Sequence, residues 1–208
     1  MDDYRDTAYC PGFEKTVEKK LEFLNKFRED HPRARDIHAY VSDNRGKYKL
    51  PFVRVYNGKC AYCGTSIEII PKSMLEIDHF IPQTSSQFAT KADAGHIENI
   101  VLSCHTCNHN KSDYELPDNL HDLLHPDHAG IKSVYYRDEM FYIKVADGQP
   151  EEVTHFYDQL QLGRETCRLD YLLLSMRGLY NKMSASSEAY SILGQAIEKL
   201  QKKRNITE

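Results

Sequence analysis

The first clear pattern of apolar and polar positions lies between Gly12 and Asp30. In the segment "GFEKTVEKKLEFLNKFRED" apolar residues recur every three or four positions, which is the spacing of one face of an α-helix. These apolar positions are Phe13, Val17, Leu21, Leu24 and Phe27. The sequence "HPR" follows, and a proline disfavours helix at the residue before it. We therefore predict an amphipathic helix over residues 12–30 that packs on the core and turns its charges to water.

Short apolar runs in the middle of the chain favour β-strands. "SIEII" and "MLEIDHFI" are two such runs, and a polar loop over residues 82–96 separates them from a third, "IENIVLSC". The third run continues into "HTCNHNK", which we expect to open a short helix. Further on, "SVYYRDEMFYIKVADGQP" alternates aromatic and polar residues and predicts a hairpin that ends at Asp147 and Gly148. Residues 155–183 predict one or two helices and residues 184–203 another, so the pattern indicates an α+β protein.

The composition is that of a globular protein with one domain, or one domain with additions. The chain has 208 residues and 40% hydrophobic content, which is enough to bury a core. No stretch reaches the roughly 18 consecutive apolar residues of a membrane span. The polar, acidic start "MDDYRDTAYCPGFEK" also differs from a signal peptide. We therefore expect a soluble, cytoplasmic protein that has no membrane partner.

The net charge of −4 and the pI near 6.2 argue against a protein that grips nucleic acid through its overall charge. Such binding would have to come from a local patch, from metal ions or from a partner chain. The best local candidate is Asn44–Lys59, which lacks acidic residues and interleaves aromatic residues with five basic ones. The basic residues are Arg45, Lys47, Lys49, Arg54 and Lys59. The segment is either a phosphate-facing surface or an irregular stretch whose aromatic residues enter the core while its charges face water.

Four of the six cysteines form two C-x2-C pairs, Cys60 with Cys63 and Cys104 with Cys107. Two such pairs supply four soft thiolates, the ligand set of a closed tetrahedral zinc site. A redox role for a C-x2-C pair needs only one pair, so structural Zn2+ is the better interpretation. The small residues around the pairs, Gly64 among them, permit tight turns. The remaining cysteines, Cys10 and Cys167, are expected to be free thiols.

Five polar residues lie between and just after the cysteine pairs: Asp78, His79, Asn99, Asn108 and Lys111. Taken singly, each has an ordinary structural explanation. Together the segments "IDHFIP", "ENIVLSC" and "CNHNKSD" resemble the HNH nucleases in order, spacing and residue type, and Asn108 stands nine positions after Asn99. The resemblance covers residues 60–113, and the cysteine pairs match the members whose core is stapled by zinc. The chain departs from the family in the loop 82–96, which keeps only one glycine, Gly95, of the usual pair.

The resemblance implies a ββα-metal fold and a role for each of these residues. His79 would be the general base, and Asp78 with Asn108 would bind a catalytic Mg2+ or Mn2+ ion. Asn99 would orient the catalytic loop and the imidazole. Lys111 would contact or neutralise phosphate, the alternative being a solvent-exposed side chain. Because neighbouring strand residues point to opposite sides, Asp78 and His79 need a twist or bend to flank one phosphate.

Other histidines near these motifs have simpler explanations. We interpret His105 and His109 as surface residues, although each is also a candidate phosphate contact. The segment "HDLLHPDHAG" contains three histidines, but their spacing fits no standard zinc pattern. We expect that segment to be a loop and turn.

The flanks of the motif region suggest how the chain is organised. We divide it into an N-terminal helical and basic segment (1–56), an HNH nuclease core with zinc knuckles (57–116), and a hairpin and helical C-terminal region (117–208). This layout is similar to that of the HNH nuclease subunits of Septu-type or retron-associated bacterial defence systems. That resemblance implies an SMC-like or ABC-type ATPase partner, which "YLLLSM" (171–176) would dock unless it simply packs in the core.

The sequence therefore predicts a metal-dependent endonuclease that hydrolyses DNA, or RNA as the alternative substrate. The competing hypothesis from another class is a non-catalytic zinc-ribbon module that binds nucleic acid or acts as a scaffold. Such a module needs the cysteines but has no need of Asp78, His79, Asn99 and Asn108. A restriction-type or homing nuclease that works alone is a third hypothesis, although a recognisable reader domain such as a helix-turn-helix is missing from the flanks.

Overall fold

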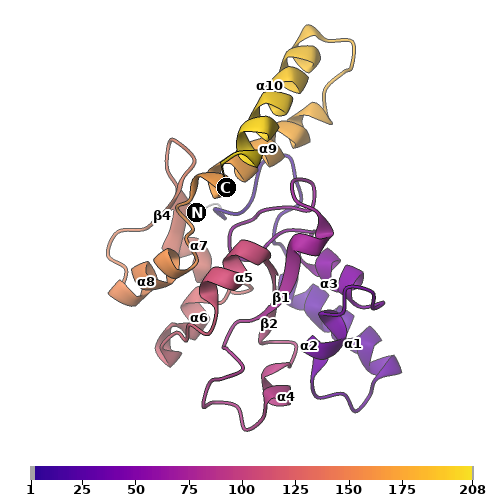
Figure 1. Cartoon of the computed structure of the whole chain (residues 1–208), viewed down its shortest axis with the longest axis vertical. Helices are drawn as coiled ribbons and strands as arrows, with labels where there is room; N and C mark the ends of the chain where they lie inside the picture. Colours follow the sequence, from indigo (N-terminus) through magenta and orange to yellow (C-terminus); the bar gives the residue numbers. More distant parts are fainter. Residues whose placement is uncertain (1–2, 208) are drawn as a thin grey trace.

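A two-stranded antiparallel sheet followed by a short helix lies at the centre of the molecule (Figure 1). The structure is a computed structural model and describes residues 3–207. Strand β1 (Leu75–His79) pairs with β2 (Ile100–Cys104), and α5 (His105–Lys111) follows β2 directly. Leu75 lies opposite Cys104 and His79 opposite Ile100. Every residue of β2 is buried, because this strand is covered on both faces. The predicted α+β class and ββα core are confirmed.

The loop between the two strands holds one short helix, α4 (Lys91–Ala94). Thr90 and Asp93 form a reciprocal capping box at its start, which gives the polar loop a defined turn. Immediately before β1 the chain forms a 3-10 turn, η1 (Lys72–Met74). The predicted strand at "SIEII" is wrong, because this stretch contributes a single bridge between Lys59 and Ser66 and then turns.

Three helices precede the core: α1 (Thr16–Asp30), α2 (Ile37–Val41) and α3 (Lys49–Val55). The predicted N-terminal helix exists and packs on the core, and the burial expected for Phe13 and Phe27 is confirmed, but two other positions of the predicted apolar face are wrong. Val17 and Leu21 are 44% and 50% exposed, whereas the helix buries Thr16, Lys20, Phe23 and Phe27. The physical reason is an ion pair, since Lys20 Nζ lies 2.5 Å from the buried carboxylate of Asp127 and turns that side of the helix inward.

Several aromatic and basic residues of the segment Asn44–Lys59 are buried in the protein. Its aromatic residues Phe52 and Tyr56 are fully buried, as the second interpretation expected. Lys49 and Lys59 are also buried, and Lys59 Nζ donates to Asp6 Oδ1 at 2.8 Å. These five basic side chains therefore do not form a continuous phosphate-facing surface.

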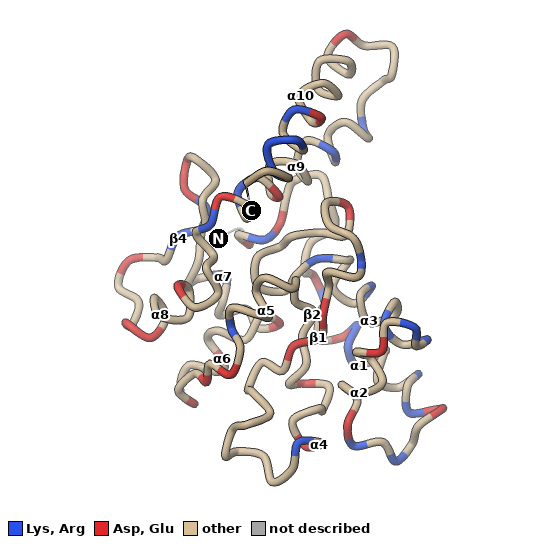
Figure 2. The backbone as a smooth tube through the Cα atoms, in the orientation of Figure 1, with Lys and Arg blue, Asp and Glu red and all other residues tan. Residues whose placement is uncertain are grey.

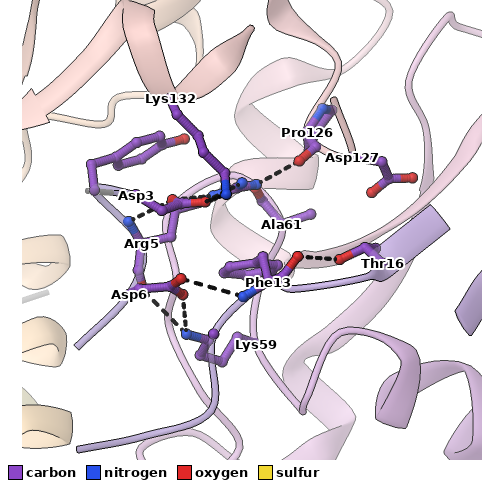
Figure 3. A network of polar contacts seen from close by, with 12 residues as sticks. Asp3, Arg5, Asp6, Phe13, Thr16, Lys59, Ala61, Pro126, Asp127 and Lys132 are labelled. Atoms are coloured by element: carbon purple, nitrogen blue, oxygen red, sulfur yellow. Dashed lines mark hydrogen bonds and ion pairs between the residues drawn. The ribbon is translucent and has the colours of Figure 1, made fainter. Parts of the chain in front are cut away.

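A buried arginine of the N-terminal segment donates hydrogen bonds to the turn that carries Cys60 and Cys63 (Figure 3). Arg5 pairs with Asp3 at 2.7 Å, and its Nη1 donates to the carbonyls of Ala61 at 2.6 Å and Pro126 at 2.9 Å. Gly64 passes so close to this segment that an added Cβ would lie 2.8 Å from the backbone oxygen of Arg5. Its φ of +81° is also unfavourable for other residues, so glycine is required at this turn.

The C-terminal region contains a hairpin and several helices. Strand β3 (Tyr135–Arg137) pairs antiparallel with β4 (Ile143–Val145), which confirms the predicted hairpin. The other elements are η2 (Asp118–Leu120), α6 (His121–Leu124), α7 (Ile131–Val134), α8 (Glu151–Gln159), α9 (Glu165–Tyr180) and α10 (Glu188–Asn205). Helices α9 and α10 form a hairpin that extends away from the core (Figure 1). Among residues 3–207, no helix is long and apolar enough to cross a membrane.

His125, from the histidine-containing segment after η2, is buried against the end of β1. Its ring lies edge-on to Phe80, with centroids 4.5 Å apart. Nδ1 accepts from the backbone N–H of Asp127 at 3.2 Å, and Nε2 lies 3.1 Å from the carbonyl oxygen of Glu98. Both nitrogens are thus satisfied by backbone groups in the neutral ring, and burial lowers the pKa of His125 to about 4.

This buried neutral histidine predicts a pH-dependent stability. The unfolded chain protonates His125 near its ordinary pKa of about 6.5 while the folded protein does not, so acid favours unfolding. The free energy of unfolding should therefore fall by about 2 kcal/mol between about pH 7.5 and about pH 5 through this group. Urea titrations of wild type and His125→Gln at both pH values measure the difference.

The exposed His155 provides the matched control. His155→Gln should keep the pH dependence of wild type. If His125→Gln lost as much stability on acidification as wild type does, His125 would not be the group responsible.

Candidate active site and zinc centre

The four paired cysteines meet in one buried cluster. The Sγ atoms of Cys60, Cys63, Cys104 and Cys107 all lie within 4.8 Å of one another. Cys104 ends β2 and Cys107 lies in the first turn of α5, while the backbone N–H of Ala61 donates to Leu102 O at 2.7 Å and ties the first knuckle to β2. Four converging, buried thiols fit tetrahedral Zn2+ and leave no position for a reacting water.

A pocket of about 380 Å³ opens where β1 ends beside α5. Asp78, His79 and Asn108 line it together with His38 and Asp113. Asp78 and His79, which are adjacent at the end of β1, thus line the same cavity. Two side chains that flank one phosphate must be arranged in this way.

Asp78 is buried, and each oxygen of its carboxylate accepts a hydrogen bond. Tyr62 Oη donates to Asp78 Oδ2 at 2.6 Å, and Lys111 Nζ lies 3.2 Å from Oδ1. Burial raises the pKa of this carboxyl group, while the charge of Lys111 and the two hydrogen bonds oppose that rise. Tyr62 lies between Cys60 and Cys63, so the segment that carries the first cysteine pair also positions the carboxylate of Asp78. Sequence reasoning missed Tyr62, because nothing in its local pattern distinguishes it from a core residue.

Lys111 is 1% exposed, so the alternative of a solvent-exposed side chain is wrong, while its contact with phosphate stays a prediction. Its ammonium group donates to the carbonyl of His79 at 2.7 Å as well as to Asp78. The structure therefore places this positive charge behind the pocket, where it neutralises the carboxylate of Asp78 and fixes the end of β1.

The two asparagines hold different parts of the site. Asn99 accepts from the backbone N–H of Ile81 at 2.8 Å, and its Nδ2 donates to the carbonyls of Ile81 and Ala94, each at 2.9 Å. It therefore fixes the loop after β1, and its hydrogen bonds do not reach the imidazole of His79. Asn108 Nδ2 donates to Glu76 Oε2 at 2.6 Å, which leaves the amide oxygen for the pocket.

Glu76 also accepts from His105 Nδ1 at 2.8 Å. His105 is half exposed, as expected for a surface residue. A carboxylate and an amide oxygen lining one pocket are the hard donors that suit Mg2+ or Mn2+, so Asp78 and Asn108 fit such an ion.

His79 is a partly buried imidazole at the pocket wall. Burial lowers its pKa to about 3, and the neighbouring charges of His38 and Lys111 act in the same direction. The ring is therefore neutral near pH 7 and able to accept a proton. It stacks on the ring of His38, with centroids 4.0 Å apart and planes inclined by 29°.

Comparison with protein families agrees with this geometry, since the model of the family "HNH endonuclease" matches residues 60–114. These residues form an HNH endonuclease domain. No curated protein and no solved structure gives a significant match to the chain. The matched range contains both cysteine pairs and all five polar residues singled out from the sequence.

The loop 82–96 contains one glycine, Gly95, and the structure explains why glycine is required there. Gly95 lies so close to Asp36 that an added Cβ would be 2.1 Å from the carboxylate oxygen. Its carbonyl accepts from the backbone N–H groups of Ile37 and His38 at 2.8 and 3.1 Å. The loop is therefore joined to α2, outside the HNH domain.

Two residues outside the HNH domain contribute to its pocket and to its cysteine cluster. His38 from α2 lines the pocket, and Arg164, at the start of α9, directs Nη2 to within 3.5 Å of Cys107 Sγ and 3.8 Å of Cys104 Sγ. Its charge opposes the excess negative charge of four thiolates around Zn2+. The sequence could not have assigned either role, because both depend on contacts between segments far apart in the chain.

Proposed function

We propose that this chain is a metal-dependent endonuclease that hydrolyses phosphodiester bonds of DNA, with RNA as the alternative substrate. The observation that carries the proposal is the pocket of the HNH domain, where the neutral imidazole of His79 faces the same space as Asp78 and Asn108. A purely structural zinc module has no need of this set.

The residues of the chain account for the main requirements of phosphodiester hydrolysis. His79 takes a proton from water, the water oxygen forms the new bond to phosphorus, and the bond to the leaving sugar oxygen breaks. Asp78 and Asn108 would hold a divalent ion, Mg2+ or Mn2+, which would supply positive charge at the phosphate and the leaving oxygen. Asn99 keeps the loop after β1 in place, and Lys111 keeps Asp78 in place. Because phosphate contacts carry no sequence information, selectivity must come from other surfaces.

The charge distribution supports a role for a partner in binding substrate. Basic and acidic residues alternate along much of the chain (Figure 2), and the net charge is −4. We infer an SMC-like or ABC-type ATPase partner in a bacterial defence system of the Septu or retron-associated type, in the cytoplasm. Docking through residues 171–176 is weakened by the burial of Leu173 and Leu174, which favours core packing.

The test is a cleavage assay on zinc-loaded protein with plasmid DNA, single-stranded DNA and total RNA. Each substrate is incubated with wild type or His79→Ala in Mg2+, in Mn2+ and without added divalent ion. Cleavage that needs the added ion and the imidazole supports the proposal and names the substrate class. If the wild type cleaves none of the substrates under any condition, even with the co-purified partner present, the proposal is rejected in favour of a zinc scaffold.

The hydrogen bond from Tyr62 predicts a change in metal dependence. Tyr62→Phe removes one partner of the Asp78 carboxylate, and such support of a ligand is worth about 10- to 100-fold in metal affinity or activity. We expect half-maximal cleavage to need at least about tenfold more Mg2+. A titration of cleavage rate against Mg2+ measures this.

Tyr157→Phe is the matched control, because it removes a tyrosine hydrogen bond, to Ile143 O at 2.8 Å, that lies outside the HNH domain. It should leave the Mg2+ dependence unchanged. Equal Mg2+ curves for Tyr62→Phe and wild type would show that Tyr62 does not prepare Asp78 for the ion.

A further inference from the structure

His38 contributes a second imidazole to the active-site pocket from outside the HNH domain. Its ring and that of His79 are stacked, with centroids 4.0 Å apart and an angle of 29° between planes. Both rings line the pocket that contains Asp78. The stack therefore covers one face of the imidazole that is proposed to accept the proton.

His38 is itself fixed by the fold. Its Nε2 lies 3.0 Å from the carbonyl oxygen of Ile77, and because a carbonyl only accepts, Nε2 carries the hydrogen. The backbone N–H groups of Ile37 and His38 both donate to Gly95 O, and Ile37 and Val41 are buried in the core. Helix α2 thus offers a rigid support on which the His38 ring is held.

His79 has few other constraints. Within residues 3–207, no hydrogen bond is formed by its ring nitrogens, and the side chain of Asn99 is committed to Ile81 and Ala94. A general base works only when its ring faces the proton it removes, and a displacement of about 1 Å can cost about 100-fold in rate. The ring of His38 is the aromatic ring that stacks on this imidazole among residues 3–207.

We propose that His38 is a positioning residue for His79, whose ring it holds by stacking so that the imidazole faces the pocket. The proposal rests on the proposed nuclease function and adds a residue outside the HNH domain to the catalytic arrangement. His38 acts through the face of its ring, so a phenyl ring should replace it, whereas a residue without a ring should not.

The kinetic test compares three variants at matched zinc content. His38→Ala should lower kcat by about 10- to 100-fold with KM for nucleic acid within about twofold of wild type. His38→Phe keeps the stacked ring and should stay within about threefold of the wild-type kcat. The control is His31→Ala, which removes a histidine ring that packs on Tyr40 at a tilt of 43°, in the same region but away from the pocket, and it should cleave like wild type. If His38→Ala fails to fold, His38→Gln takes its place, because it removes the ring and can keep the hydrogen bond to Ile77.

A second measurement does not depend on activity. In proton NMR spectra the Cε1–H resonance of His79 should move downfield in His38→Ala, because the shielding by the stacked ring is lost. An unchanged resonance, an unchanged kcat in His38→Ala, or a His38→Phe variant as slow as His38→Ala would each overturn the proposal. A wild type that cleaves nothing, with the co-purified partner present as well, while the resonance still moves would instead reject the nuclease function and leave the stack established.

Discussion

Replacing Cys107 with serine is expected to release zinc and destabilise the whole HNH domain. The four buried thiols converge on one point, and a hydroxyl group does not replace a thiolate as a zinc ligand. Zinc contributes roughly 10–16 kcal/mol to small structural sites, so loss of one ligand in four removes on the order of 2.5 to 4 kcal/mol. That is a large fraction of the roughly 5–15 kcal/mol that stabilises a typical domain.

Zinc content by elemental analysis and unfolding by urea check this prediction. Wild type should carry one zinc per chain, and Cys107→Ser should carry much less and unfold at lower urea. Cys10→Ser is the matched control, since Cys10 lies outside the cluster and contacts Leu174 O at 3.6 Å. Full zinc content in Cys107→Ser would mean that the cluster is not a four-thiolate zinc site.

Loss of the imidazole of His79 is expected to reduce cleavage by about 10²- to 10⁴-fold, the usual contribution of a general base. The ring faces the pocket in its neutral form, and the variant His79→Ala leaves no group at that position to accept the proton of water. Binding of nucleic acid should persist, because the imidazole is needed for the chemical step. Single-turnover cleavage and a binding titration on the same substrate separate the two effects.

His155→Ala is the control for loss of a histidine, because His155 is exposed on α8. It should cleave at the wild-type rate. A His79→Ala variant that retained full activity would assign the base to another group, and weaker binding with an unchanged cleavage rate would make His79 a substrate contact.

Much of the site could be predicted from short segments of the chain. The cysteine pairs, the Asp78-His79 pair and the spacing of Asn99 and Asn108 indicated zinc and an HNH core, because each ligand set is carried by a local turn or strand end. The hairpin of β3 and β4 followed from alternation and turn residues in the same way. The division of the chain at residues 56/57 and 116/117 stays a prediction, and buried residues from all three segments contribute to one hydrophobic core.

The errors came from residues whose environment is set by distant partners. Val17 and Leu21 are exposed because Lys20 turns inward to Asp127, more than 100 positions away. The alternative of a solvent-exposed Lys111 is wrong because its charge is buried against Asp78. A buried charge is tolerated only where an opposite charge meets it, and no periodic pattern reveals that partner.

Residue types and their spacing were enough to predict four thiols for zinc and an HNH set of carboxylate, imidazole and amides. The contacts that hold those groups emerged from the folded chain: Tyr62 on Asp78, His38 on His79 and Arg164 beside the cysteine thiols. This difference arises because local spacing fixes which groups share a turn or strand. The orientation and charge of each group depend on close contacts with side chains far away along the chain.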